Sequence, residues 1–259
     1  MSSYESLALR YDALTADVDH NAWADYLEKH FSRSPIPIHT VLDLACGTGA
    51  LTCLLAQRGY EMIGVDLSAE MLSVASEKAR DLTGVIPPMF LQQPMEELDL
   101  YGTIDACVCC LDSVNYVTRP KALLRAFQRV HLFLMPGGLF LFDINTPEKL
   151  EGLDGGMFID ETDDTYCVWR ADYARRSRIC TYGFDLSSGR LTVSGVGRKR
   201  SMRSVPMRPR SSPSCSGQPV SRTFNNMATG SCGIPSPAKV GYFLQPERNF
   251  NIIWMKLYA

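Results

Sequence analysis

The chain has 259 residues, of which 46% are hydrophobic and 10% aromatic, and its formal net charge is −2. That apolar content is enough to bury one substantial core, or one core with a small appended lobe. No apolar run approaches the ~20 residues that a membrane span requires, and the first residues show neither the basic nor the apolar region of a signal peptide. We therefore expect a cytoplasmic protein with no membrane partner.

Nine cysteines are present, an odd number, and Cys107, Cys109 and Cys110 lie inside an apolar run. Disulfides are therefore not the expected use of these residues. Alternate residues of a strand point to opposite faces, so three cysteines in this pattern do not converge on a metal ion. We expect buried, reduced thiols and no bound metal.

The first predicted element is a helix over residues 4–31, because Trp23, Tyr26, Leu27 and Phe31 recur at helical spacing. Prolines at 35 and 37 end it. Beyond them, apolar runs typical of strands alternate with helical patterns. The predicted strands are residues 40–45, 61–66, 88–92, 104–111 and 139–144. The predicted helices run from Gly49 to residue 58, over residues 69–79 and over residues 122–134. This alternation predicts an α/β fold, a doubly wound, Rossmann-like parallel sheet with helices on both faces.

After residue 150 the pattern changes to two aromatic-rich runs, residues 166–170 and 179–186. They predict a small antiparallel insertion that follows the fifth strand and covers the mouth of the sheet. The domain organisation we expect is therefore residues 1–150 for a helical cap and the Rossmann-like domain, 151–189 for the insertion, and 190–259 for a tail.

The tail differs sharply in composition from the rest. Residues 1–185 carry 27 acids and 15 bases, whereas residues 186–246 carry nine bases and no acid; 26 of those 61 residues are Ser, Pro or Gly. Such a segment lacks the apolar density to offset its ordering entropy, so we expect it to be poorly ordered and the fifth strand to be left as an exposed edge. The abrupt change suggests the hypothesis that the last ~70 residues are read from a shifted frame; reading the encoding DNA in the other two frames tests it.

The run Asp43-Leu-Ala-Cys-Gly47-Thr-Gly49 lies between a strand and a helix, and Asp66 ends the next strand. Glycines let a ligand approach the backbone, and an acid at the end of the second strand is placed to bind ribose hydroxyls. The third glycine that a dinucleotide-binding loop requires is Thr52 here, which argues against a nicotinamide-dependent dehydrogenase. Asp43, four residues before the first glycine, suits a ligand with an ammonium group.

The segment VLDLACGTG (residues 41–49) closely resembles the first motif of class I S-adenosylmethionine-dependent methyltransferases. Residues 64–68 (GVDLS), 105–116 and 136–138 (PGG) are similar to the motifs of the second strand, the fourth strand and the turn before the fifth. Tyr4 and Tyr11-Asp12 resemble the N-terminal cap of the small-molecule branch, in which a tyrosine closes over the cofactor. The resemblance covers about residues 4–186 and implies S-adenosyl-L-methionine as cofactor.

By this resemblance Asp66 would hold the ribose hydroxyls, and Leu67 and Met71 would pack near the adenine. The family's acid before the methionine of the third loop is Pro94 here, which leaves the adenine amino group to Gln93 or a backbone carbonyl. The implied cofactor-binding residues are Tyr11, Asp43, Ala45, Cys46, Gly47, Thr48, Gly49, Asp66, Leu67, Met71, Gln93, Met95 and Leu111.

The catalytic residue is left open, because methyl transfer depends mainly on alignment and needs a base only for a protonated acceptor. The candidates are Asp112, Asn115 and Tyr116. Each has a structural alternative: Asp112 as a helix cap, Tyr116 as a packing residue. His20 lies in a polar run and is better explained as a solvated residue.

We predict an enzyme that methylates a small-molecule acceptor. The alternative is a catalytically impaired remnant that only binds the cofactor, because its C-terminal segment is replaced. The basic run of residues 198–200 lacks interleaved aromatic residues, so nucleic acid is not an expected partner. The acceptor and the oligomeric state are not encoded in any motif of the chain.

Overall fold

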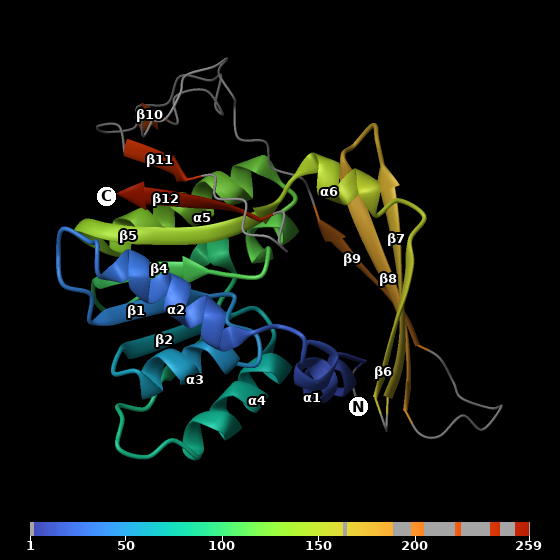
Figure 1. Cartoon of the computed structure of the whole chain (residues 1–259), viewed down its shortest axis with the longest axis horizontal. Helices are drawn as coiled ribbons and strands as arrows, with labels where there is room; N and C mark the ends of the chain where they lie inside the picture. Colours follow the sequence, from blue (N-terminus) through green and yellow to red (C-terminus); the bar gives the residue numbers. More distant parts are fainter. Residues whose placement is uncertain are drawn as a thin grey trace.

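The computed structural model describes residues 3–162, 165–188, 198–204, 221–223, 239–243 and 252–258. Two sheets stand side by side, a large one wrapped by helices and a small antiparallel one (Figure 1). The helices are α1 (Ser3–Leu14), α2 (His20–Phe31), α3 (Ala50–Gln57), α4 (Ala69–Arg80), α5 (Pro120–Phe133) and α6 (Pro147–Gly152), with 3-10 turns η1 (Met95–Glu97) and η2 (Ser113–Tyr116). The strands are β1 (Thr40–Leu44), β2 (Glu61–Asp66), β3 (Met89–Gln92), β4 (Ile104–Cys109), β5 (Leu134–Asn145), β6 (Met157–Thr162), β7 (Thr165–Ala174), β8 (Ile179–Ser188), β9 (Arg198–Ser204), β10 (Ser221–Thr223), β11 (Lys239–Phe243) and β12 (Ile252–Tyr258).

The large sheet has the strand order β10-β11-β12-β5-β4-β1-β2-β3. Strands β1 to β5 are mutually parallel, as the alternating pattern predicted. The chain runs outward from β1 through β2 to β3, and then returns to the other side of β1 for β4 and β5. The strand order therefore reverses between β1 and β4, and in open α/β sheets ligands bind beyond the carboxyl ends of the strands at such a point.

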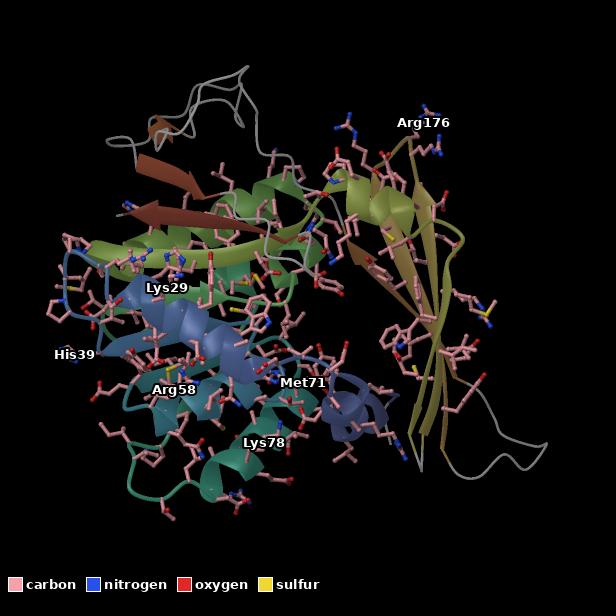
Figure 2. All side chains as sticks on the ribbon, viewed as in Figure 1. Lys29, His39, Arg58, Met71, Lys78 and Arg176 are labelled. Carbon is pink, nitrogen blue, oxygen red and sulfur yellow. The ribbon has the colours of Figure 1, made fainter. Side chains whose placement is uncertain are left out.

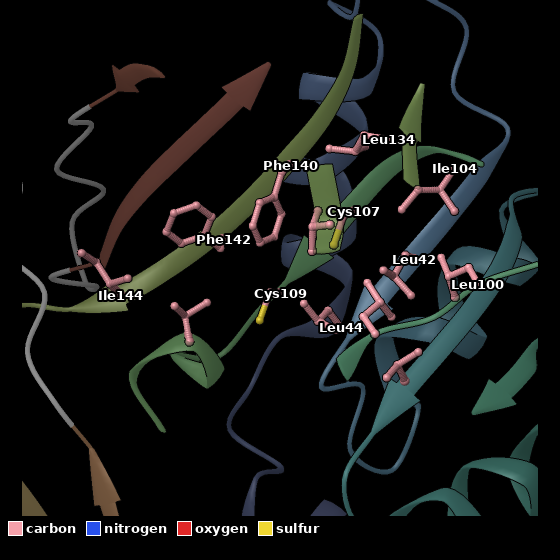
Figure 3. Packing of buried hydrophobic residues seen from close by; sticks show 14 residues of the cluster. Leu42, Leu44, Leu100, Ile104, Cys107, Cys109, Leu134, Phe140, Phe142 and Ile144 are labelled. Atoms are coloured by element: carbon pink, nitrogen blue, oxygen red, sulfur yellow. The ribbon is translucent and has the colours of Figure 1, made fainter. Parts of the chain in front are cut away.

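Helices cover both faces of this sheet, which confirms the predicted fold class. One face packs its apolar side chains, among them Leu42, Phe140 and Phe142, against Val130 of α5 (Figure 3). The other face packs against α2 and α3, for example through Leu27 and Leu55. The three cysteines of the β4 region are buried as predicted, and their side chains divide between the two clusters. Period-two alternation of strand side chains explains the division.

The single helix predicted over residues 4–31 is wrong in one respect, because the chain breaks it into α1 and α2. The backbone N–H of Ala22 donates to the Asp19 side chain at 2.9 Å, so Asp19 caps the start of α2. A side-chain acceptor at this position satisfies an N–H that a continuous helix would have used internally. The break allows α1 to leave the helical layer and pack against α4 and β6.

The expectation that β5 is an exposed edge is also wrong. Strand β12 pairs with it antiparallel, with Ile252 opposite Asn145 and Tyr258 opposite Leu139, and β11 and β10 extend the sheet. The short apolar run of β12 was visible in the sequence, but a period of two over seven residues is a weak signal beside a Ser/Pro-rich background. The prediction about order in residues 190–259 falls largely outside the described residues.

The antiparallel insertion after the fifth strand is confirmed and is larger than the two predicted strands. Its order is β6-β7-β8-β9, and β9 comes from the segment predicted to be tail. Leu14 of α1 packs beside Trp169 against the buried Cys167 and Phe184 of this small sheet. Helix α1 therefore links the small sheet to the helical layer of the large one (Figure 1).

Candidate functional site

The glycine loop after β1 turns through backbone conformations that favour glycine. Ala45, Gly47 and Gly49 have φ of 64°, 55° and 72°. A Cβ on Gly49 would lie 2.8 Å from the Cβ of Ala75, so this glycine is required by the close approach of α4. A Cβ on Gly47 would meet nothing within 4 Å. The loop is thus packed on its inner side and open at Gly47, where a ligand can lie against the backbone.

Asp66, at the end of β2, fixes this loop. The backbone N–H of Gly47 donates to its Oδ2 at 2.9 Å, and that of Ser68 donates to its Oδ1 at 2.8 Å. A carboxylate has about four acceptor positions, so each oxygen keeps one for a further donor such as a ribose hydroxyl. Asp66 is therefore a structural anchor of the loop as well as a candidate ligand.

Asp43 lies deep under the loop, with only 3% of its surface exposed. The hydroxyl of Thr52 donates to its Oδ2 at 2.6 Å. Burial raises the pKa of Asp43 to about 6, against the effect of the Thr52 hydrogen bond. Thr52 stands where a dinucleotide-binding motif has its third glycine. Its role in this protein is to donate a hydrogen bond to the buried carboxylate of Asp43.

Two residues that sequence reasoning did not assign connect α1 to the loop. The Thr48 hydroxyl donates to Oδ1 of Asp12 at 2.6 Å, and Lys78 of α4 forms an ion pair with the other oxygen of Asp12 (Figure 2). Asp12 had been noted only as the neighbour of Tyr11, and nothing in the local pattern of α4 distinguishes Lys78. The contact places Tyr11 beside the loop, and burial raises the pKa of Tyr11 to about 12.

On the adenine side, the predicted residues surround the end of β2 and β3. Leu67 is 69% exposed, and Met71 is half-buried in the first turn of α4 (Figure 2). The amide of Gln93 exchanges two hydrogen bonds with the backbone of Asp99, at 2.8 and 3.0 Å. Gln93 therefore braces its own loop, and both ends of its amide are engaged there.

The other half of the site lies at the carboxyl ends of β4 and β5. Leu111 and Asp112 are consecutive non-glycine residues with positive φ, 58° and 51°. Such a conformation costs free energy and concentrates at functional sites. The backbone N–H of Asp112 donates to Oδ2 of Asp143 at 2.8 Å, so the strained turn is held from β5. Asp112 makes no side-chain capping bond to η2, which removes the capping explanation for this residue.

Polar side chains fill the space between the two strands. Asn115 is fully buried; its Oδ1 accepts from the backbone N–H of Asn145 at 2.9 Å and its Nδ2 donates to the carbonyl of Asn145 at 3.1 Å. The Nδ2 of Asn145 donates to Oδ2 of Asp112 at 2.7 Å. Asn115 is thus a positioning residue that joins η2 to β5, and its amide is already engaged at both ends.

Burial raises the pKa of both acids in this half, to about 6 for Asp112 and about 7 for Asp143. The charge of Asp112 raises the pKa of Asp143 further, and the charge of Lys149 lowers both. Oδ1 of Asp143 is buried and has no hydrogen-bond partner within the described part of the chain. An unsatisfied buried acceptor of this kind is costly and rare in folded proteins.

Three tyrosines interact electrostatically with Asp112: Tyr11 of α1, Tyr116 of η2 and Tyr182 of β8. Burial raises the pKa of each above its ordinary value. Tyr116 nevertheless exposes 42% of its surface, so its ring has a face open to a ligand. No local pattern predicted that Tyr182 lies near Asp112, because it comes from a strand about 70 residues later in the chain.

A hollow lies beside the Asp12–Lys78 ion pair, outside the glycine loop. His20 lines this hollow of about 310 Å³ with Asp12, Cys53 and Lys78, between α1, α3 and α4. Within the described segments, no group of His, Cys, Asp and Glu side chains is arranged to hold a metal ion. The helices of those same segments include none long and apolar enough to cross a membrane.

Known proteins match both the sequence and the arrangement of this chain. A family model described as a methyltransferase domain matches residues 41–138. "Putative methyltransferase YqeM" of Bacillus subtilis is 35% identical over 170 residues, which is 65% of this chain and 66% of that protein. A relative with the same description in Geobacillus sp. is 31% identical over 64% of this chain and 68% of its own length.

Among solved structures, an S-adenosylmethionine-dependent methyltransferase from Clostridium acetobutylicum superimposes with a TM-score of 0.74. The match covers 99% of this chain and 98% of that one, at 24% identity. At this identity the likeness is one of fold, and it includes both the parallel sheet and the region of the small antiparallel sheet.

Proposed function

The chain belongs to the class I S-adenosylmethionine-dependent methyltransferases, and we propose that it transfers a methyl group to a small-molecule acceptor held beside Asp112. The observation that carries the proposal is the pairing of an open glycine loop at β1 with a strained, half-buried acid at the end of β4. The two lie on either side of the point at which the strand order reverses. An acceptor beside Asp112 is therefore adjacent to a ligand on the loop.

The residues of the loop fit the cofactor. Gly47 leaves room for a ligand, Asp66 retains acceptor positions for ribose hydroxyls, and Leu67 offers exposed apolar surface to a flat ring. When bound, the cofactor supplies an activated sulfonium methyl group. Asp43 contributes negative charge below the loop, which favours the ammonium group of an amino-acid ligand.

The remaining residues align the acceptor and exclude water. Helix α1, held by Asp12, covers the loop and brings Tyr11 toward Asp112. Because the pKa of Tyr11 and Tyr116 is raised, both phenols stay protonated at neutral pH and neither serves as a base. Asn115 is not titratable. Of the three catalytic candidates, Asp112 is the one that can accept a proton from the acceptor.

Calorimetric titration with S-adenosylmethionine, S-adenosylhomocysteine and NAD tests the cofactor assignment. We expect both adenosyl ligands to bind, NAD not to bind, and Asp66→Ala to weaken adenosyl binding by about 100-fold, the loss of hydrogen bonds to a charged group. Asp81→Ala, which removes an exposed acid at the end of α4, is the matched control and should bind as the wild type does. Binding of NAD alone would contradict the proposal.

A turnover assay separates an active enzyme from a remnant that only binds the cofactor. The assay measures S-adenosylhomocysteine released in the presence of amines, phenols, alcohols and carboxylates. Release that depends on one acceptor class supports the proposal. Tight binding with no release on the whole panel would favour the remnant.

A further inference from the structure

We propose that the acceptor is a small amine, bound as its ammonium form by Asp112 among the rings of Tyr11, Tyr116 and Tyr182. This inference rests on the proposed function and narrows it to one class of acceptor. It is carried by a carboxylate oxygen of Asp112 that accepts no hydrogen bond from the described residues, and by the buried acid Asp143 that is bonded to the Asp112 backbone. Three tyrosines near enough to feel the charge of Asp112 support it.

The carboxylate of Asp112 is only half satisfied. Its Oδ2 accepts from Asn145, whereas no hydrogen bond reaches its Oδ1 from any part of the chain that the structure describes. The side chain is held in one place, because its strained backbone is bonded to Asp143 and its Oδ2 is fixed. A rigid carboxylate with one free oxygen is prepared to accept from an N–H donor of a ligand.

Asp143 adds a second negative charge beside Asp112 and so strengthens the attraction for a cation. Its unpartnered Oδ1 is buried, and its charge and that of Asp112 oppose each other. A cation brought to Asp112 relieves this repulsion, whereas an anionic acceptor increases it. A carboxylate or phosphate acceptor is therefore disfavoured at this position.

The three tyrosines supply the other half of the recognition. They come from three separate elements, α1, η2 and β8, and all interact with Asp112. Their phenols remain neutral, so the rings add no competing charge, and Tyr116 is 42% exposed. A cation over such faces is stabilised, and groups of aromatic rings are a common way to bind substituted ammonium ions. The fold therefore brings three tyrosines into the neighbourhood of one carboxylate, which is the combination that the proposal requires.

The charged groups on the neighbouring elements set the electrostatic balance around Asp112. Lys149 of α6 is the one described cation whose charge reaches Asp112, and no ion pair within 4.0 Å joins the two among the described residues. Asp12 and Asp66 add negative charge on the side of Tyr11. The net charge around Asp112 is thus negative. Lys149 repels a bound cation but does not neutralise Asp112.

Methyl transfer to an amine needs only the amine and the cofactor as reactants. The ammonium group gives one proton to Oδ1 of Asp112, which passes it to water. The freed nitrogen lone pair forms a new N–C bond to the methyl group, and the electron pair of the breaking S–C bond stays on sulfur. An amine R–NH₃⁺ and S-adenosylmethionine thus give R–NH₂CH₃⁺, S-adenosylhomocysteine and one proton.

Binding of tetramethylammonium, measured by calorimetry with S-adenosylhomocysteine present, tests the recognition directly. We expect tetramethylammonium to bind and its neutral counterpart, neopentyl alcohol, not to bind. Asp112→Asn should weaken tetramethylammonium binding by about tenfold or more, because it removes the charge and keeps the shape. Asp172→Asn, at an exposed acid of β7, is the control and should have no effect. Equal binding by the wild type and Asp112→Asn would overturn the proposal.

Three further variants separate the effect of the rings from the effect of the charge. Tyr116→Phe should keep the affinity for tetramethylammonium within about twofold, whereas Tyr116→Ala should lower it several-fold. Lys149→Met should strengthen tetramethylammonium binding, because it removes a positive charge that repels the cation. Weaker binding would contradict the proposal. Far-UV circular dichroism and the melting temperature of each variant show whether it is folded.

Turnover gives an independent readout. Propylamine, propanol, propionate and phenol are compared at equal concentration, and release of S-adenosylhomocysteine is measured. Release that requires propylamine and falls as pH decreases through about 6, the pKa of Asp112, supports the inference. Release with phenol or propanol alone overturns the inference but leaves the proposed function intact. Failure of the wild type to bind either adenosyl ligand would instead remove the proposed function itself.

Discussion

Two pairs of acids lie at the same edge of the large sheet and differ in how they are satisfied. In the cofactor half, Asp66 accepts two backbone N–H groups and Asp43 accepts the Thr52 hydroxyl. In the acceptor half, Asp143 keeps a buried oxygen without a partner in the described residues, and Asp112 adopts a strained backbone. The cofactor half is therefore complete as a folded structure, whereas the acceptor half retains polar groups that a ligand would satisfy.

This difference explains why the two halves depend on different physical effects. The cofactor half is stabilised by close packing and by hydrogen bonds between segments near one another in sequence. The acceptor half holds like charges together at a cost in free energy, which is typical of functional sites. Four substitutions test this comparison.

The largest effect is expected for Gly49→Ala, which disturbs the packed side of the cofactor half. The added Cβ meets Ala75 at 2.8 Å and the residue has φ of +72°, so the free energy of unfolding should fall by about 3 kcal/mol. Gly84→Ala is a matched control, because Gly84 has φ of +73° and open space around it, and should cost about 1 kcal/mol. Urea denaturation measures both. Equal losses would show that contact with α4 does not constrain the loop.

Thr52→Val removes the hydroxyl that donates to Asp43 and should cost about 2 kcal/mol at pH 8. The folded pKa of Asp43, about 6, lies above its ordinary 3.8, so ionisation of this residue removes stability as pH rises from about 4 through 6. The Thr52 hydrogen bond limits that loss, so the cost of the variant should be larger at pH 8 than at pH 5. Thr40→Val, which breaks an exposed bond to Glu61, should cost less than about 0.5 kcal/mol at either pH. A cost independent of pH would contradict the assignment.

Asp143→Asn tests the acceptor half and should stabilise the protein. The amide oxygen still accepts from Asp112, but the buried charge is lost. The folded pKa of Asp143, about 7, is raised, so the wild type loses stability as pH rises through 7 and the variant does not. We expect a gain of about 1 kcal/mol at pH 8 and no change at pH 4, measured by thermal unfolding. Destabilisation at pH 8 would show that Asp143 has an unrecognised partner.

The smallest effect is expected for Asp12→Ala, which releases α1 from the glycine loop and from α4. The ion pair with Lys78 is partly exposed, so global stability should change by about 1 kcal/mol or less. Hydrogen exchange of α1 should accelerate much more than that of α2, because α1 loses its tie to Thr48. Asp17→Ala, at an exposed acid beyond α1, should leave the exchange unchanged.

Local sequence patterns predicted much of the site, because the residues of its cofactor half lie close together in the sequence. The glycines, the ends of β1 and β2, and Asp66 lie within 26 residues, and strand–helix alternation predicts that these elements meet at one edge. The same logic correctly placed Asp112 at the end of β4. It failed for the break between α1 and α2, because the polar residues that end one helix and cap the next lie within a stretch of helical spacing. It also failed for β12, because that strand pairs with β5 across more than 100 residues of sequence.

The sequence by itself determined the fold class, the cofactor loop and the acids at the strand ends, because these follow from short-range periodicity and from glycine geometry. Only the tertiary structure decided which partners those acids have. It brought Asp12 to Thr48, Thr52 to Asp43, Asp143 to Asp112 and Tyr182 to the acceptor side. Contacts of this kind join elements distant in the chain, and no local pattern encodes the distance between them.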